Sequence, residues 1–186
     1  MKAVLRQAPN ILSALRLVLA PVAGWLILHG DFFPALWVFG IAGASDAIDG
    51  FLAKSFGLSS RFGAWLDPAA DKLLMLASFV TLAMVGAVPV WLTLLVIGRD
   101  VAIVAGVGLA RILGAPLAIA PLFIGKISTV VQVLYVAMTL LLLTLRTDEP
   151  EAMAMGVLAV AALTLASLFA YAHVWFQAVA ARSKVA

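Results

Sequence analysis

The segment Ser45–Lys72, SDAIDGFLAKSFGLSSRFGAWLDPAADK, is the stretch that decides how this chain folds. Most of the chain outside it is apolar, whereas this segment carries four aspartates. Asp46 and Asp49 are three residues apart, and Asp67 and Asp71 are four residues apart. Residues at these separations share one face of an α-helix, so the segment predicts two helices that each present a carboxylate pair.

A short connection joins the two predicted helices and contains Gly57, Ser59, Ser60 and Gly63. If the acidic faces pack together, the four carboxylates repel one another and stay protonated unless a cation neutralises them. Oxygen ligands of this kind suit Mg²⁺ or Mn²⁺. The spacing therefore predicts a site for two divalent cations that bridge phosphate oxygens and orient an in-line displacement. Its expected ligands are Asp46, Asp49, Asp67 and Asp71.

The composition is that of a membrane protein. The chain is 65% hydrophobic and 11% charged, with a mean hydropathy of +1.17, and apolar segments of spanning length recur along it. It contains no cysteine, which excludes disulfides and thiolate metal sites. The net charge is +3, but the basic residues are dispersed at the ends of the apolar segments, so no nucleic-acid partner is expected.

We expect a single all-α membrane domain over residues 1–186, with six transmembrane helices and a short N-terminal interfacial segment. Pro9 and Asn10 are expected to end that segment, Met1–Ala8, and Pro68 to kink or reset the third span. The first apolar run lacks a convincing cleavage site and is interpreted as a retained helix. The expected spans lie at about 11–28, 33–54, 62–85, 90–113, 122–145 and 153–178.

The distribution of basic residues predicts the orientation. With six spans both termini lie on one side, and the side richer in Lys and Arg is normally cytoplasmic. Only Arg146 falls on the opposite side. We therefore expect a protein of the bacterial inner membrane whose termini and aspartate segment face the cytoplasm. The residues behind this expectation are Lys2, Arg6, Lys54, Arg61, Arg111, Lys126, Arg182 and Lys184.

Two arginines lie inside apolar runs. Arg16 is over a turn into the first span, so it needs an anionic partner or must extend its side chain to the interface. Arg99 precedes Asp100 in the fourth span, which indicates either a local ion pair or a cationic lining for an anionic acceptor. Lys126 and Arg111 could join that lining or serve only as cytoplasmic anchors.

Small and aromatic residues mark the fourth and sixth spans. Small residues favour close helix packing, within one chain or between two chains. Tyr171, Trp175 and Phe176 are interpreted as an aromatic belt at the membrane interface. The small residues are Ala102, Ala105, Gly106, Gly108, Ala159, Ala162 and Ala166.

The aspartate segment resembles the signature of the CDP-alcohol phosphotransferase (CDP-alcohol phosphatidyltransferase) family. That signature is DxxDGxxAR, eight residues, then GxxxDxxxD, and the chain matches its full spacing with Lys54 in place of the usual Arg. Lys54 keeps the charge but lacks the planar guanidinium that contacts phosphate through two donors. The opening residues 9–16, PNILSALR, are similar to the first span of the phosphatidyl-transferring branch.

The resemblance implies six transmembrane helices, a homodimer, a cavity facing the cytoplasm and two divalent metals. It implies that Asp46, Asp49 and Asp67 hold metal, and that Asp71 is the general base and may touch the second metal. The acceptor hydroxyl then attacks the β-phosphorus of CDP-diacylglycerol, and CMP leaves. The residues implied to bind CDP-diacylglycerol are Asn10, Ser13, Gly50, Ala53, Lys54, Ser60 and Gly63.

Two acceptors remain open. Phosphatidylglycerophosphate synthases, which use glycerol 3-phosphate, share the form DPxADK found at Asp67–Lys72. Phe123–Ser128, Ala170–His173 and Arg111 are more similar to mitochondrial-type cardiolipin synthases, which use the membrane lipid phosphatidylglycerol. We therefore expect phosphatidylglycerol as the acceptor, with Arg99, Arg111 and Lys126 near this anionic lipid or, alternatively, near a polyol phosphate.

A cation transporter that uses intramembrane carboxylates is an alternative from another class. A transporter would spread acidic residues over several spans, often with repeat symmetry. Here the carboxylates are concentrated in one segment flanked by candidate phosphate-binding residues, which favours the transferase.

Overall fold

The structure is a computed structural model that describes residues 2–56, 63–112 and 122–182, with side chains over residues 14–45, 69–109 and 122–177. Every regular element in this part of the chain is an α-helix, so the all-α prediction is confirmed. The helices are α1 (Lys2–Leu28), α2 (Phe32–Phe56), α3 (Gly63–Met84), α4 (Val90–Ile112), α5 (Phe123–Leu145) and α6 (Pro150–Arg182).

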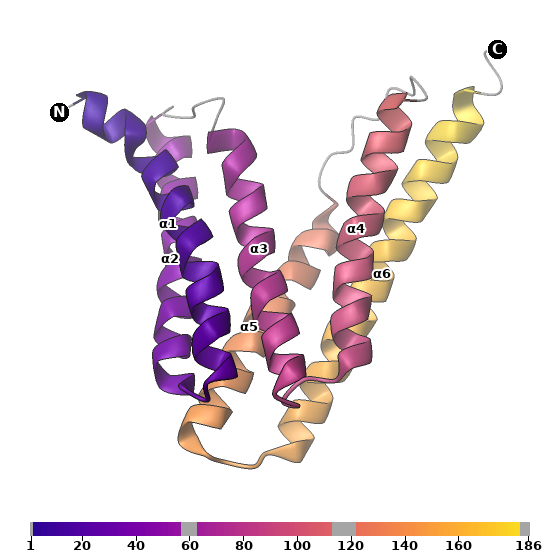
Figure 1. Cartoon of the computed structure of the whole chain (residues 1–186). Coiled ribbons are helices and arrows are strands. Elements are labelled where there is room, and N and C mark those ends of the chain that lie inside the picture. The colour runs from indigo at the N-terminus through magenta and orange to yellow at the C-terminus, as the bar shows by residue number, and fades with distance from the viewer. Residues whose placement is uncertain (1, 57–62, 113–121, 183–186) are drawn as a thin grey trace. The chain divides into compact units, whose positions relative to one another are not determined.

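The expected break at Pro9 and Asn10 is wrong. α1 is one helix from Lys2 to Leu28, and it includes both residues. A proline inside a helix removes one backbone hydrogen bond and bends the helix, but flanking residues of good helix propensity can continue it. Figure 1 shows α1 bending near its N-terminal end. α3 likewise runs without interruption through Pro68, which lies early in that helix.

Three helices of the described residues are long and apolar enough to cross a membrane. The candidate spans are Val90–Leu109 in α4, Phe123–Leu145 in α5 and Pro150–Gln177 in α6. α1 and α2 contain shorter apolar stretches, Ala14–Leu28 and Phe32–Ser45. The six helices are therefore confirmed as helices, whereas six transmembrane spans stay a prediction.

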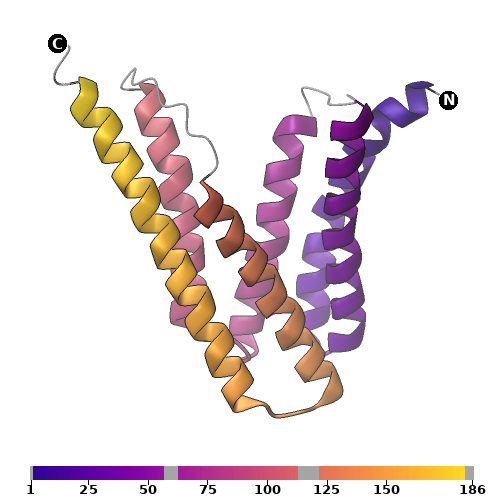
Figure 2. The same ribbon diagram turned by 180° about the vertical axis from the view of Figure 1, so that it is seen from behind.

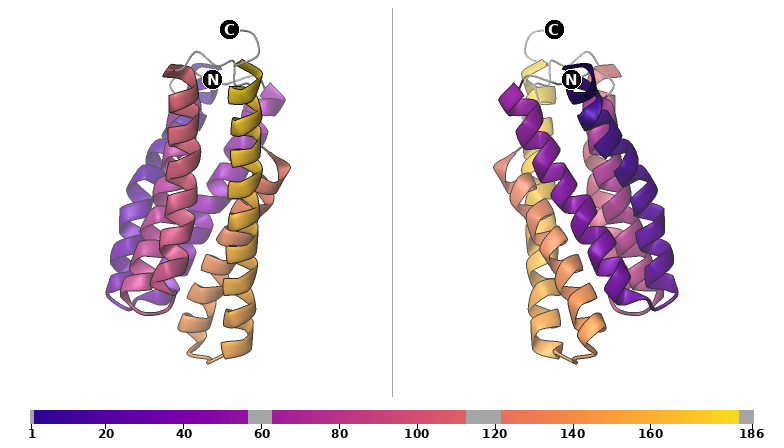
Figure 3. Two further views of the ribbon diagram at one scale, coloured as in Figure 1. Left: turned by 90° about the vertical axis from the view of Figure 1, so that its right-hand side faces the viewer. Right: turned by 90° about the vertical axis from the view of Figure 1, so that its left-hand side faces the viewer.

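The chain forms two compact units, and the first contains α1, α2, α3 and the second half of α5. α1 packs against both α2 and α3, as Figure 1 and the right-hand view of Figure 3 show. Ala20, Ala23 and Phe79 are buried in this unit. Gly24 permits the close approach of α1 to α3, because a Cβ there would lie 3.2 Å from Thr81 Cγ2.

The second unit contains α4, the first half of α5 and α6. α4 and α6 run side by side, as Figure 2 and the left-hand view of Figure 3 show. Their small residues were predicted to favour close packing within one chain or between two chains, and this contact corresponds to the first alternative.

Several hydroxyls inside the helices bond to their own helix. Ser78 Oγ donates to Leu74 O over 2.8 Å, and Thr81 Oγ1 donates to Ala77 O over 2.7 Å. Thr144 Oγ1 makes the same kind of bond to Leu140 O, over 2.8 Å. Each hydroxyl donates a hydrogen bond to the backbone carbonyl four residues earlier in its own helix, so it needs no acceptor from another helix.

Candidate functional site

The four aspartates lie on two helices that contact each other. α2 carries Asp46 and Asp49, α3 carries Asp67 and Asp71, and the two helices pack together. The prediction that each pair lies on a helix is therefore confirmed for the backbone. The side chains of Asp46, Asp49 and Asp67 lie outside the described residues.

The backbone also locates the other predicted site residues. Gly50, Ala53 and Lys54 follow the first aspartate pair in α2, and Gly63 begins α3. Ser60 lies outside the described residues, as do the side chains of Asn10, Ser13, Lys54 and Arg111. Asn10 and Ser13 belong to α1, so the candidate nucleotide-binding residues within the described helices come from α1, α2 and α3 of the first unit. Arg111, an acceptor candidate, belongs to α4.

Asp71 is the one aspartate of this set whose side chain is described, and it forms an ion pair with Arg16 of α1. Arg16 Nη1 donates to Asp71 Oδ1. The Arg16 side chain is 0% exposed, whereas that of Asp71 is 43% exposed. The expectation that Arg16 needs an anionic partner is thus confirmed, and the bond joins α1 to α3 beside the predicted metal ligands.

The donor set fits a divalent cation by its chemistry. Two carboxylate pairs at helical spacing on contacting helices offer hard oxygen ligands. The Asp71 side chain is 43% exposed, so it is accessible at the surface of the described residues. Among the described side chains alone there is no group of three or more carboxylate or imidazole ligands.

Arg99 is buried in the second unit, where neighbouring residues occupy most of its donors. Nη1 donates to Asp100 Oδ1 over 2.7 Å, while Nε and Nη2 donate to Ser167 Oγ over 3.2 and 2.8 Å. Nη2 also reaches Gly125 O at 3.5 Å. The local ion pair is therefore present, and Arg99 joins α4 to α5 and α6 with 8% of its side chain exposed.

A second polar contact lies between α5 and α6. Gln132 Nε2 donates to Thr164 Oγ1 over 3.1 Å and to Ser128 Oγ over 3.3 Å. All three residues are buried. No structural role was predicted from the sequence for these residues or for Ser167. Their separations of three and four residues on apolar helices are the signal that could have identified them, because residues so spaced share one face.

Gly125 and Lys126 begin α5 beside Arg99. A Cβ at Gly125 would lie 3.1 Å from Arg99 Nη2 and 3.2 Å from Tyr171 Oη, so any larger residue here would force these side chains to shift by a few tenths of an ångström. Lys126, the next residue, is exposed. Of the three predicted acceptor residues, Lys126 is therefore the one whose described side chain is accessible to a ligand.

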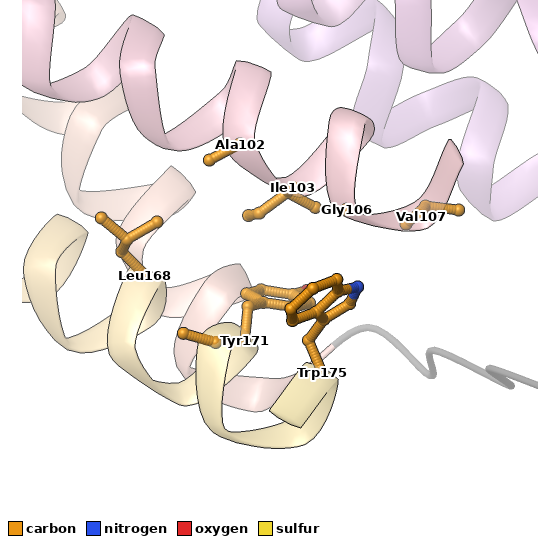
Figure 4. Close-up of a pocket in the computed structure, with 8 residues that line it drawn as sticks. Ala102, Ile103, Gly106, Val107, Leu168, Tyr171 and Trp175 are labelled. Carbon is orange, nitrogen blue, oxygen red and sulfur yellow. The ribbon is translucent and has the colours of Figure 1, made fainter. Parts of the chain in front are cut away.

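An apolar groove lies between α4 and α6, with a volume of about 240 Å³ (Figure 4). Tyr171 and Trp175 line it from α6, and their assignment to an aromatic belt at the membrane interface stays a prediction. Of the three aromatic residues of that belt only Phe176, at 66%, is largely exposed. Tyr171 also contacts the polar residues, because Leu122 N donates to its hydroxyl over 3.3 Å and its ring centroid lies 5.9 Å from Arg99 Cζ. We call this the α4–α6 groove.

Comparison with known proteins connects these features to one family. The sequence model of the CDP-alcohol phosphatidyltransferase family matches residues 6–179. A Rattus norvegicus protein named cardiolipin synthase (CMP-forming) is 40% identical over 148 residues, which cover 71% of this chain and 49% of that protein.

Other relatives carry a different name. A chloroplastic CDP-diacylglycerol–glycerol-3-phosphate 3-phosphatidyltransferase of Oryza sativa subsp. japonica is 34% identical over 160 residues, which cover 77% of this chain and 49% of that protein. A probable phosphatidylglycerophosphate synthase of Mycobacterium tuberculosis is 36% identical over 100 residues, covering 50% of this chain and 48% of that protein. The chain spans about half the length of these relatives.

The ion pair of Arg16 and Asp71 should couple α1 to α3 energetically. Arg16→Ala should lower the free energy of unfolding by about 2 kcal/mol, because a buried charge-assisted hydrogen bond is lost. The measurement is thermal unfolding in detergent of Arg16→Ala, Asp71→Asn and the double variant. The double variant should lose less than the sum of the two single changes; strict additivity would show that the pair contributes nothing.

Gly125→Ala should destabilise the second unit by about 1 to 3 kcal/mol, because the added methyl group is forced against Arg99 and Tyr171. Gly98→Ala is the matched control, since a Cβ at Gly98 meets nothing within 4 Å. Thermal unfolding of both variants gives the comparison. Equal unfolding temperatures would contradict the close contact at Gly125.

Proposed function

The chain belongs to the CDP-alcohol phosphatidyltransferase family, and from this premise we propose that it transfers a phosphatidyl group from CDP-diacylglycerol to an alcohol, with release of CMP. The observation that carries the proposal is the complete aspartate signature on α2 and α3, two helices in contact, within a match over residues 6–179. The family and the relatives named above are transferases, which favours this function over cation transport.

In the proposed reaction Asp46, Asp49, Asp67 and Asp71 hold two divalent cations, Mg²⁺ or Mn²⁺. When bound, these cations neutralise the pyrophosphate and the charge that develops on it. Gly50, Ala53, Lys54, Ser60 and Gly63 bind the CDP portion of the substrate, with Asn10 and Ser13 beside it. The positions of Gly50, Ala53 and Lys54 on the same helix as Asp46 and Asp49 support this assignment.

Asp71 is the proposed general base. It accepts the proton of the acceptor hydroxyl, whose oxygen forms a new bond to the β-phosphorus attached to diacylglycerol. The bond from that phosphorus to the bridging oxygen breaks, and CMP leaves with the electron pair. Arg16 supports this role, because its ion pair fixes the orientation of the Asp71 carboxylate while leaving the side chain 43% exposed to a substrate.

We propose phosphatidylglycerol as the acceptor, with cardiolipin as the product. The similarity to cardiolipin synthases of Rattus norvegicus and Homo sapiens, each 40% identical over 148 residues, supports this choice. The rice and mycobacterial relatives support glycerol 3-phosphate as the second candidate. Lys126 is exposed, and we assign it and Arg111 to the phosphate of either acceptor. Arg99 is engaged by its neighbours and acts by placing Gly125 and Lys126.

We further propose a homodimer in the bacterial inner membrane, surrounded by membrane lipids, with the termini and the aspartate site facing the cytoplasm. The three long apolar helices support an integral membrane protein. The positions of the basic residues at one set of span ends support the orientation.

Asp71→Asn should lower kcat by about 10²- to 10⁴-fold, because the amide cannot accept the proton. The measurement is CMP release from CDP-diacylglycerol and phosphatidylglycerol with Mg²⁺ or Mn²⁺, alongside the metal content of the purified variant, which should be retained. Asp148→Asn is the control, since Asp148 is exposed at the connection between α5 and α6. Full activity of Asp71→Asn would refute the assigned base.

The acceptor is identified by offering purified protein phosphatidylglycerol and glycerol 3-phosphate in separate reactions. We expect cardiolipin from the first reaction and little lipid product from the second. Mass spectrometry of the extracted lipids distinguishes the products. Product from glycerol 3-phosphate alone would overturn the choice of acceptor and leave the phosphatidyl transfer in place.

A further inference from the structure

The α4–α6 groove is built within two candidate membrane spans. Ala102, Ile103 and Gly106 line it from α4 within the span Val90–Leu109, and Leu168 and Tyr171 line it from α6 within the span Pro150–Gln177. Figure 4 shows the side chains of Leu168, Tyr171 and Trp175 directed toward α4. An apolar groove at this position in a bilayer is accessible to hydrocarbon and unsuited to a polar ligand.

The outer faces of the same helices are also apolar and exposed. Val101 and Val104 of α4 are 61% and 59% exposed, and Phe169 of α6 is 70% exposed. In sequence these residues neighbour the ones that line the groove, and their exposed apolar side chains suit contact with lipid chains. A Cβ at Gly106 would lie 3.8 Å from Trp175 Cδ1, in ordinary van der Waals contact, so a side chain longer than that of alanine would extend into the groove.

Tyr171 connects the groove to charged residues. Its ring lines the groove and faces the Arg99 guanidinium, and its hydroxyl accepts a hydrogen bond from Leu122 N at the start of α5. The exposed Lys126 lies one turn into that helix, directly after Gly125, which contacts Tyr171. A ligand that matches this arrangement has an apolar chain and an anionic headgroup.

We propose that the α4–α6 groove binds an acyl chain of the acceptor, an anionic glycerophospholipid whose headgroup phosphate lies near Lys126. This inference rests on the proposed phosphatidyl transfer and deepens it, since it makes the groove a determinant of specificity for a lipid acceptor over a water-soluble one. The groove, Tyr171 and Lys126 all belong to the second unit, whereas the residues proposed to bind CDP-diacylglycerol lie on or between helices of the first unit. We assign the acyl chain in the groove to the acceptor, and the experiments below test CDP-diacylglycerol as the alternative occupant.

Gly106→Leu fills the groove and should raise the KM for dioleoyl phosphatidylglycerol about tenfold, because several methylene groups lose their apolar contacts. The KM for CDP-diacylglycerol should stay unchanged. Gly108→Leu is the matched control, with the same substitution on the same helix at a position where a Cβ meets nothing within 4 Å. It should leave both KM values unchanged.

The dependence of KM on the length of the acceptor's acyl chains distinguishes a blocked groove from a general loss of structure. For the unaltered protein, shortening the acceptor acyl chains to six carbons should raise KM about tenfold, whereas Gly106→Leu should show almost no dependence on chain length. Equal losses for long and short chains, or a rise in the KM for CDP-diacylglycerol in place of that for the acceptor, would overturn the proposal.

A readout without turnover distinguishes this proposal from the proposed function itself. Phosphatidylglycerol with a photoreactive acyl chain should crosslink to peptides that contain residues 102–107 or 168–175, and unlabelled phosphatidylglycerol should reduce the yield more than CDP-diacylglycerol does. Crosslinks confined to other helices would overturn the groove assignment even if the enzyme is active. Specific crosslinks in a protein that releases no CMP would support the groove and contradict the proposed reaction.

Discussion

The ion pair between Arg16 and Asp71 is the interaction on which the aspartate site depends. Arg16 is fully buried, and an unpaired buried charge costs several kcal/mol. Its partner is one of the four aspartates of the signature, so the contact that stabilises α1 against α3 also orients a side chain of the site. The proposed site is thus anchored by a charge that comes from outside the signature, and this ion pair connects α1 to it.

The sequence predicted well the helices that carry the aspartates, because helix formation depends on local spacing, whereas the meeting of the four carboxylates stays a prediction. Asp46 and Asp49, or Asp67 and Asp71, share a helix face whatever surrounds them. It predicted that Arg16 needs an anionic partner or must extend to the interface, but it could not identify Asp71, since a partner distant in sequence leaves no periodic signal. The predicted break at Pro9 was wrong because a proline removes one backbone hydrogen bond, but the neighbouring residues determine whether the helix continues past it.

The second unit shows what composition alone could not reveal. Small residues in the fourth and sixth spans indicated close packing, and α4 does lie against α6. The same residues also leave an apolar groove, and the two aromatics assigned to an interfacial belt line it. Arg99, Ser167, Gln132 and Thr164 fix the helices around that groove through bonds between residues far apart in the chain. Whether a small residue closes a contact or opens a groove depends on its neighbours in space.

The two buried arginines place different demands on biogenesis. Arg99 is followed immediately by Asp100, so the carboxylate that neutralises it is synthesised with it in the same helix. Arg16 is synthesised 55 residues before Asp71. Release of α1 alone into lipid would expose an uncompensated charge, whereas the hydroxyls of Ser78, Thr81 and Thr144 are already satisfied within their own helices. If α1 spans the membrane, as the sequence predicts, the counter-charge of Arg16 becomes available only after the third helix has been made.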